Sequence, residues 1–209
     1  PLQLGEAVDA LRGRARELGF SERNVHFVER GFDWDLLRSD AGSMSLFGDR
    51  RVIEIRMPSG KPGTQGAAAL QALLDPPPAD VLLLVITDKL DFAAQKAEWL
   101  RAIESAGVWL NVPEVSPARL PDWLRGRCQA AGLTADDDAL RLLAERVEGN
   151  LLAAHQEIQK LALLQPGARL TVDTIAGGVA DSSRFEVFAL GDAALAGDAA
   201  RALHILDVL

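Results

Sequence analysis

The stretch DAGSMSLFGDRRVIEIRM, residues 40–57, decides the fold of this chain. Its first part closes an amphipathic helix that we expect over residues 34–44. Gly48 follows, and glycine is the residue that most readily ends a helix in a left-handed conformation. Residues 50–57 then form a run of strand length that is rich in β-branched side chains. A helix, a tight turn and a strand in direct succession are typical of an α/β protein.

Outward from this stretch, strands alternate with helices up to about residue 113. The expected strands are 24–28, 50–57, 81–86 and 108–112, and the expected helices are 1–18, 34–44, 66–74 and 92–105. The run Val-Leu-Leu-Leu-Val-Ile at 81–86 is apolar without alternation, as in a strand covered on both faces, so we expect it inside the sheet. The alternation predicts a mostly parallel sheet wrapped by helices.

Beyond Pro113 the sequence predicts helices and no strand. We expect helices that begin near residues 120, 134, 150 and 171, and two more between 185 and 209. Thr134 and Asp137 have the spacing of a capping box, and Asn150 is suited to cap the helix after it. The boundary between an α/β part and an all-helical part is therefore expected near residues 113–117.

Composition and charge narrow the class of protein. The 209 residues carry a net charge of -8, which argues against a protein that coats duplex DNA by itself. The single cysteine, Cys128, cannot form an internal disulfide. The sequence shows no signal-peptide pattern and no apolar run near twenty residues, so we expect a cytoplasmic protein that does not enter the membrane.

The loop after the 50–57 strand has the context of a phosphate-binding loop but not its residues. With Lys61 as the lysine of G-x-x-x-x-G-K-[ST], the first glycine would be Ile55 and the hydroxyl residue would be Pro62. Proline also removes one of the backbone N–H groups that hold phosphate. We therefore expect no nucleotide site in this loop.

No other pattern predicts catalysis or a metal site. The histidines lack cysteine or carboxylate partners at ligand spacing, which argues against zinc: His26, His155 and His204. No G-x-S-x-G motif supports a serine nucleophile. Asp88 is interpreted as an exposed carboxylate at a strand end, and the arginine clusters 12–16 and 119–127 as solvated surfaces. We expect no catalytic residue, no cofactor and no metal.

The pair Leu46-Phe47 at the predicted helix tip allows two interpretations. Most large apolar residues are buried, so the pair can belong to the core. Alternatively it is an exposed apolar plug that enters a pocket of a partner protein, as the hot spots of many interfaces do.

The order Ser-Leu-Phe-Gly-Asp-Arg-Arg at 45–51, leading directly into a strand, resembles the clamp-binding tip of the delta subunit family of bacterial DNA polymerase III. Delta is the clamp-opening subunit of the clamp loader. Further segments along nearly the whole chain resemble the same family: 26–34, 88–90, 120–124, 148–153 and 201–206.

The resemblance implies a three-part organisation. Residues 1–113 would be an AAA+/RecA-like α/β domain without a nucleotide site, 114–182 a helical lid domain, and 183–209 the start of a helical collar domain. It also implies a fragment, because the family has a strand and a Gly-Asp-Glu segment before the position of Pro1 and a collar that continues past Leu209.

The resemblance further implies a clamp-loader subunit without catalysis of its own, a component of the DNA polymerase III holoenzyme. It would bind the sliding clamp and open one ring interface, so that the clamp can be loaded on primed DNA during replication. Leu46 and Phe47 would be the plug, Met44 and Ser45 would place it, and Gly48 would turn the chain away.

The partners implied by the resemblance are the sliding clamp (the beta subunit), the ATP-binding motor subunits, the delta-prime subunit and, through the assembled complex, primed DNA. The location would be the replisome in the bacterial cytoplasm. Two other functions stay open from the residues. One is a degenerate AAA+-type nucleoside triphosphatase, and the other is a DNA-binding module, which the acidic charge disfavours.

Overall fold

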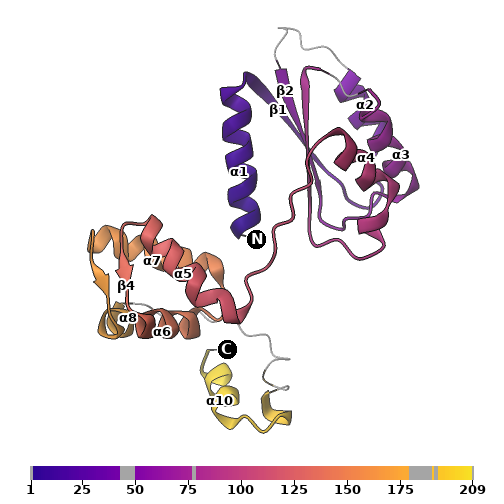
Figure 1. Cartoon of the computed structure of the whole chain (residues 1–209). Helices are drawn as coiled ribbons and strands as arrows, with labels where there is room; N and C mark the ends of the chain where they lie inside the picture. Colours follow the sequence, from indigo (N-terminus) through magenta and orange to yellow (C-terminus); the bar gives the residue numbers. More distant parts are fainter. Residues whose placement is uncertain (1, 43–49, 77–78, 179–189, 191–192, 209) are drawn as a thin grey trace. The chain divides into compact units, whose positions relative to one another are not determined.

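The computed structural model describes residues 2–42, 50–76, 79–178, 190 and 193–208 (Figure 1). The chain divides into two compact units, Gln3–Val112 and Pro113–Leu209, and each is described by itself. The three-domain organisation expected from the sequence stays a prediction.

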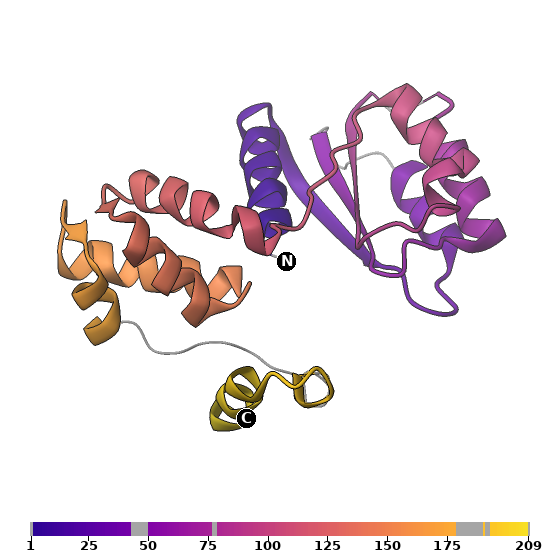
Figure 2. The ribbon, with the colours of Figure 1, turned by 60° about the horizontal axis from the view of Figure 1, so that its bottom comes forward.

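The first unit is built on a parallel three-stranded sheet with the order β1-β2-β3. Its strands are β1 (Phe20–Phe27), β2 (Arg50–Met57) and β3 (Val81–Thr87). Its helices are α1 (Leu2–Glu17), α2 (Trp34–Gly42), α3 (Gly63–Leu73), the short 3-10 helix η1 (Ala94–Lys96) and α4 (Glu98–Ala106). Figures 1 and 2 show α1 on one side of the sheet and α2, α3 and α4 on the other. The predicted fold class, an α/β part followed by a helical part, is confirmed.

The apolar positions of these elements meet between the sheet and helices α2 to α4. On α2, Trp34, Leu37 and Ala41 are buried at helical spacing. On β2, alternate residues point to one face, and the central strand buries nearly all its side chains. The cluster comprises Val28, Trp34, Leu37, Ala41, Ile53, Ile55, Met57, Ala69, Leu70, Leu90, Trp99 and Leu100.

Strand β3 is an edge strand among the described residues, so the predicted interior position of 81–86 is wrong. The residues at 108–112, predicted to be a strand, have no regular structure, and Val108 is 87% exposed. A strand needs a neighbour to complete its backbone hydrogen bonds, and in the described part β3 pairs with β2 alone. The apolar run of β3 still packs, since Val81, Leu83 and Val85 contact the cluster.

The helix predicted at 92–105 is instead two elements, η1 and α4. The Asp91 side chain accepts a hydrogen bond from the Ala94 backbone N–H at 2.8 Å, which favours a local turn. Ala97 has an extended backbone, with φ -69° and ψ 147°, and this interrupts the helix before Glu98. Periodicity alone did not show the interruption, because the alanines on both sides suit a continuous helix.

The second unit is mainly helical. It contains η2 (Pro117–Arg119), α5 (Leu120–Ala130), α6 (Asp137–Val147), α7 (Leu151–Leu164), α8 (Val172–Gly178) and α10 (Ala199–Val208). The prediction that no strand follows Pro113 is wrong, because β4 (Thr134–Ala135) and β5 (Arg169–Leu170) form a short parallel pair. Two-residue strands leave no periodic pattern in a sequence.

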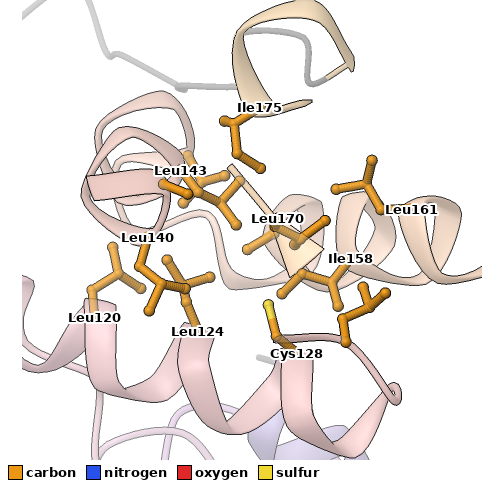
Figure 3. Packing of buried hydrophobic residues seen from close by; sticks show 13 residues of the cluster. Leu120, Leu124, Cys128, Leu140, Leu143, Ile158, Leu161, Leu170 and Ile175 are labelled. Atoms are coloured by element: carbon orange, nitrogen blue, oxygen red, sulfur yellow. The ribbon is translucent and has the colours of Figure 1, made fainter. Parts of the chain in front are cut away.

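Figure 3 shows the core of this unit, where side chains from α5, α6, α7, β5 and α8 point toward one another. Leu124 and Leu143 are fully buried, and so is Ile158. Burial raises the pKa of the Cys128 thiol to about 11, so Cys128 packs here as a small apolar residue.

Helix starts in this unit were predicted with mixed success. Asn150 caps α7 as predicted, because its side chain accepts the Ala153 N–H at 3.2 Å. The capping box at Thr134 and Asp137 is wrong, since Thr134 belongs to β4 and the N-cap of α6 is Asp136. In the described part of the chain we find no helix with the length and apolarity needed to cross a bilayer.

Candidate functional site

The residues predicted to bind a clamp lie outside the described residues: Met44, Ser45, Leu46, Phe47 and Gly48. Their roles stay predictions. The structure does describe the elements on both sides, since α2 ends at Gly42 and β2 begins at Arg50. Because the three strands of this sheet are parallel, they all begin at the same end of the sheet, and Arg50 lies at that end. The loop at 58–62, which follows β2, lies at the opposite end of the sheet, at the carboxyl ends of the strands, where α/β proteins commonly bind nucleotides.

Asp40 connects the last turn of α2 to the two neighbouring strands. Its Oδ1 accepts a hydrogen bond from the Asn24 amide at 2.8 Å, and its Oδ2 lies 2.7 Å from Nε2 of His26. Nη1 of Arg51 lies 3.9 Å from Oδ1 of Asp40. The side chains of Asp40 and His26 are each 18% exposed and that of Arg51 is 5% exposed, so water screens this group only weakly.

The start of α2 is also fixed beside β1, through aromatic rings. The His26 ring meets Phe32 edge to face, with centroids 6.1 Å apart. Phe32 in turn meets Trp34, the first residue of α2, at 5.0 Å and 82°. Both ends of α2 are thus tied to β1, and His26 takes part in both contacts.

On the opposite face of β2, a buried carboxylate is held by three arginines. Glu54 is fully buried, and its oxygens accept hydrogen bonds from Arg12 Nη2 at 2.6 Å, Arg56 Nε at 2.7 Å and Arg23 Nη1 at 3.1 Å. Burial by itself would raise the pKa of Glu54, but the hydrogen bonds from Arg12 and Arg56 lower it to about 2. A carboxylate with this pKa stays ionised and is a poor general base, so its role is to join α1 to β2.

This arginine–glutamate network was missed in the sequence. Arg12 was interpreted as part of a solvated surface, yet its side chain lies against Glu54 and its pKa is raised by the hydrogen bond to that residue. The usable signal was Glu54 itself, because an acid inside an apolar strand that is covered on both faces needs a cationic partner.

The loop after β2 differs from a phosphate cradle. Nζ of Lys61 lies 3.3 Å from the Asp91 carboxylate. The pKa of Asp91 is lowered by the Ala94 N–H and then by Lys61. Pro62 occupies the N-cap of α3, where it offers no N–H and no side-chain cap.

The described histidines, cysteine and acids include no group of three or more that could hold a metal ion. Asp88, predicted to be an exposed carboxylate at a strand end, lies just after β3 and is exposed.

Comparison with known proteins adds an independent finding. The family model for the delta subunit of DNA polymerase III matches residues 1–112. DNA polymerase III subunit delta of Escherichia coli K12 is 34% identical over 209 residues, which is 100% of this chain and 61% of that protein. The subunit delta of Haemophilus influenzae is 33% identical over 209 residues, 99% of this chain and 60% of that protein. This chain therefore spans about three fifths of the length of these relatives.

A solved structure agrees in fold. The Bacillus subtilis DNA clamp loader delta protein (YqeN) matches with a TM-score of 0.63 and 18% sequence identity, over 99% of this chain and 64% of that one. The structural match extends across both units, and the family model covers the first. Together with relatives more than 30% identical along the chain, these findings show that the chain belongs to the delta subunit family of DNA polymerase III.

Proposed function

We propose that this chain binds a ring-shaped sliding clamp and, within a clamp loader, holds one ring interface open while the clamp is loaded on primed DNA. The observation that carries the proposal is the Leu46-Phe47 pair between α2 and β2, inside the region that the family model matches. An adjacent leucine and phenylalanine can fill a pocket of a partner and form the centre of an interface.

The surrounding structure supports a binding role for this segment. A binding group is most effective on rigid elements, because less conformational freedom is lost on binding. Here α2 is packed through Trp34, Leu37 and Ala41, and β2 is the central strand. Both neighbours of the segment are therefore firmly held.

Clamp opening would be a shift of population. A wedge that binds the open ring more tightly than the closed ring favours the open form by the difference in affinity, and about 10⁴-fold is needed to move 1:99 to 99:1. This mechanism needs no catalysis by the chain itself. ATP-binding motor subunits would supply the energy and decide whether the wedge is exposed. A delta-prime subunit would be a further partner, and the assembled complex would contact primed DNA at the replisome in the bacterial cytoplasm.

The direct test replaces Leu46 and Phe47 with alanine together and measures binding to purified beta clamp. Each hot-spot truncation costs about 2 kcal/mol or more, so we expect a loss on the order of a thousandfold in affinity, with little change in melting temperature. Leu36→Ala is the matched control, because Leu36 lies on α2 and is 59% exposed. A folded double variant with full affinity would overturn the proposal, and a double variant that unfolds would show that the pair is core.

A nucleotide titration separates this proposal from the degenerate nucleoside triphosphatase. Pro62 without an N–H and the Lys61 pair with Asp91 support a loop that does not hold phosphate. We expect ATP with magnesium to leave the melting temperature unchanged. A ligand at a hundredfold its dissociation constant adds about 2.7 kcal/mol, so a concentration-dependent rise of several degrees would favour the enzyme.

A further inference from the structure

A polar cluster lies where the 43–49 segment joins the fold. We call Asn24, His26, Asp40 and Arg51 the neck cluster. Asp40 comes three residues before Ser43, and Arg51 comes two residues after Asp49. The elements on both sides of residues 43–49 therefore meet at one carboxylate, which belongs to α2 and is approached by Arg51 of β2.

The geometry of the neck cluster is directional. Asn24 and His26 lie two residues apart on β1 and so point to the same face of the sheet, where they meet the two oxygens of Asp40 at 2.8 and 2.7 Å. Arg51 approaches Oδ1 of the same carboxylate at 3.9 Å. Apolar contacts allow a helix end to slide, whereas a carboxylate with partners from two strands specifies one position.

The contacts of the neck cluster are not needed to pack α2 against the sheet. The helix already buries Trp34, Leu37 and Ala41 in the apolar core, and Asp40 lies beside this stripe rather than in it. Replacing a partly buried ionic group by apolar residues of similar volume often costs no stability, so stability alone does not require the charge of Asp40.

We propose that Asp40 is a positioning residue for clamp binding, which acts by holding the end of α2 and the start of β2, the elements on either side of residues 43–49, in a fixed relative position through the neck cluster. This inference rests on the proposed function of Leu46 and Phe47. Its physical basis is preorganisation, since a binding group whose ends are fixed loses less freedom when it enters a pocket.

The test measures clamp affinity for the whole 209-residue chain carrying Asp40→Ala or Asp40→Asn. We expect about tenfold weaker binding for Asp40→Ala, and a smaller loss for Asp40→Asn, which keeps one oxygen for Asn24. Asp35→Ala is the control, because Asp35 lies on the same helix with an exposed side chain, and its affinity should equal that of the wild type.

A double-mutant cycle separates positioning from a general loss of stability. In the chain that already carries Leu46→Ala and Phe47→Ala, adding Asp40→Ala should leave the residual clamp binding unchanged, because Asp40 acts through that pair. Hydrogen exchange of the free chain should be faster over residues 38–42 in Asp40→Ala, and unchanged there in Asp35→Ala.

The outcomes distinguish the two proposals. If the Leu46 and Phe47 double variant loses binding while folded Asp40→Ala binds like the wild type, the neck cluster inference is overturned and the proposed function stands. If the double variant keeps full affinity, the proposed function itself fails. Should Asp40→Ala not fold, Asn24→Ala decides in its place, since it removes one hydrogen bond and no charge, and wild-type affinity would again refute the inference.

Discussion

Each of the two units of the chain has its own core, and the two cores differ in kind. Among the described residues, the buried charged side chains are Arg51 and Glu54, and both lie on β2 of the α/β unit. The buried cluster of the helical unit, from Leu120 to Ile175, consists of apolar residues and Cys128. The core of the α/β unit thus combines apolar packing with directional ionic contacts. The core of the helical unit is stabilised by the packing of apolar side chains.

This difference concerns β2, the strand that follows the proposed clamp-binding segment. Glu54 ties one face of β2 to Arg12 of α1, and Arg51 joins the other face to Asp40 of α2. Ionic contacts with fixed directions specify one register, whereas an apolar core tolerates rearrangements of similar volume. The α/β unit is therefore suited to hold α2 and β2 in one relative position.

The largest expected change in stability comes from removing Glu54, the centre of the ionic contacts in the α/β unit. Glu54→Ala should destabilise the α/β unit by about 3–5 kcal/mol, because it removes the buried carboxylate that Arg12 contacts and leaves this mostly buried guanidinium with the exposed Asp9. Hydrogen exchange read by mass spectrometry should show faster exchange in α1, β1 and β2, with peptides of the helical unit unchanged. The control Glu17→Ala removes an exposed acid of α1 and should change stability by less than about 0.5 kcal/mol. A loss for Glu54→Ala below about 1 kcal/mol would show that the network is dispensable.

The matching change in the apolar core is Leu143→Ala. Leu143 is fully buried, so its truncation should cost about 3 kcal/mol, within the usual range of about 2–5. The faster exchange should now appear in α5, α6 and α7 and not in the sheet. Leu163→Ala is the control, since Leu163 is 83% exposed and its loss should cost little. Equal disturbance of both units by either variant would break the comparison.

The same contrast explains what the sequence could predict. The β-branched run at 50–57 and the helical spacing of Trp34 and Leu37 are local signals, and the structure contains both elements. The partnership of Glu54 with Arg12 joins residues 42 positions apart, and no local pattern specifies it. The edge position of β3 likewise depends on which strands pair, and not on the residues of β3 alone.

The candidate site likewise has a part that the sequence predicts and a part that it does not. The clamp-binding role of Leu46 and Phe47 is predicted from the order of the residues around them, through a family resemblance, and stays a prediction. The Asp40 contacts with Asn24 and His26 were not predicted, because β1 and α2 meet only in the folded chain. His26 was interpreted as having no carboxylate partner at ligand spacing, and its partner is 14 residues away.

Acid provides a smaller and reversible test of the ionic core. The pKa of Glu54 is lowered from 4.5 to about 2, so its contribution to stability is complete above about pH 4.5 and is lost as the pH falls toward 2. We expect the α/β unit to lose stability through this interval more steeply than the helical unit. Trp34, Trp99 and Trp109 all belong to the α/β unit, so tryptophan fluorescence in a Trp123→Phe background reports on it.

The Glu54→Gln variant is the control for this titration. Because glutamine does not titrate, the variant should be less stable at pH 7 and should lose less further stability between pH 4.5 and 2. An unchanged acid profile in Glu54→Gln would mean that other carboxylates cause the acid sensitivity of the unit.

The smallest effects come from two helical glycines, and they should have opposite signs. Gly126 in α5 is exposed with no atom within 4 Å of an added Cβ, so Gly126→Ala should stabilise the helical unit by about 1 kcal/mol through helix propensity. A Cβ on Gly66 in α3 would overlap the indole ring of Trp34 and would lie 2.7 Å from Cβ of Pro62. Overpacking of this kind costs about 1–3 kcal/mol, which exceeds or cancels the gain in propensity, so Gly66→Ala should be neutral or destabilising by up to about 2 kcal/mol.

Urea unfolding of both glycine variants at constant m-value gives the two signs directly. The Gly66 result also bears on the binding segment, because Trp34 begins the helix that leads to Asp40 and then to residue 43. If α2 is held as rigidly as its contacts indicate, an added methyl group cannot be absorbed by a movement of Trp34, and Gly66→Ala must lose the gain that Gly126→Ala shows. Equal stabilisation by both substitutions would mean that α2 shifts freely on the sheet. A helix that shifts freely could not keep one position relative to β2, and residues 43–49 would then not join two rigid elements.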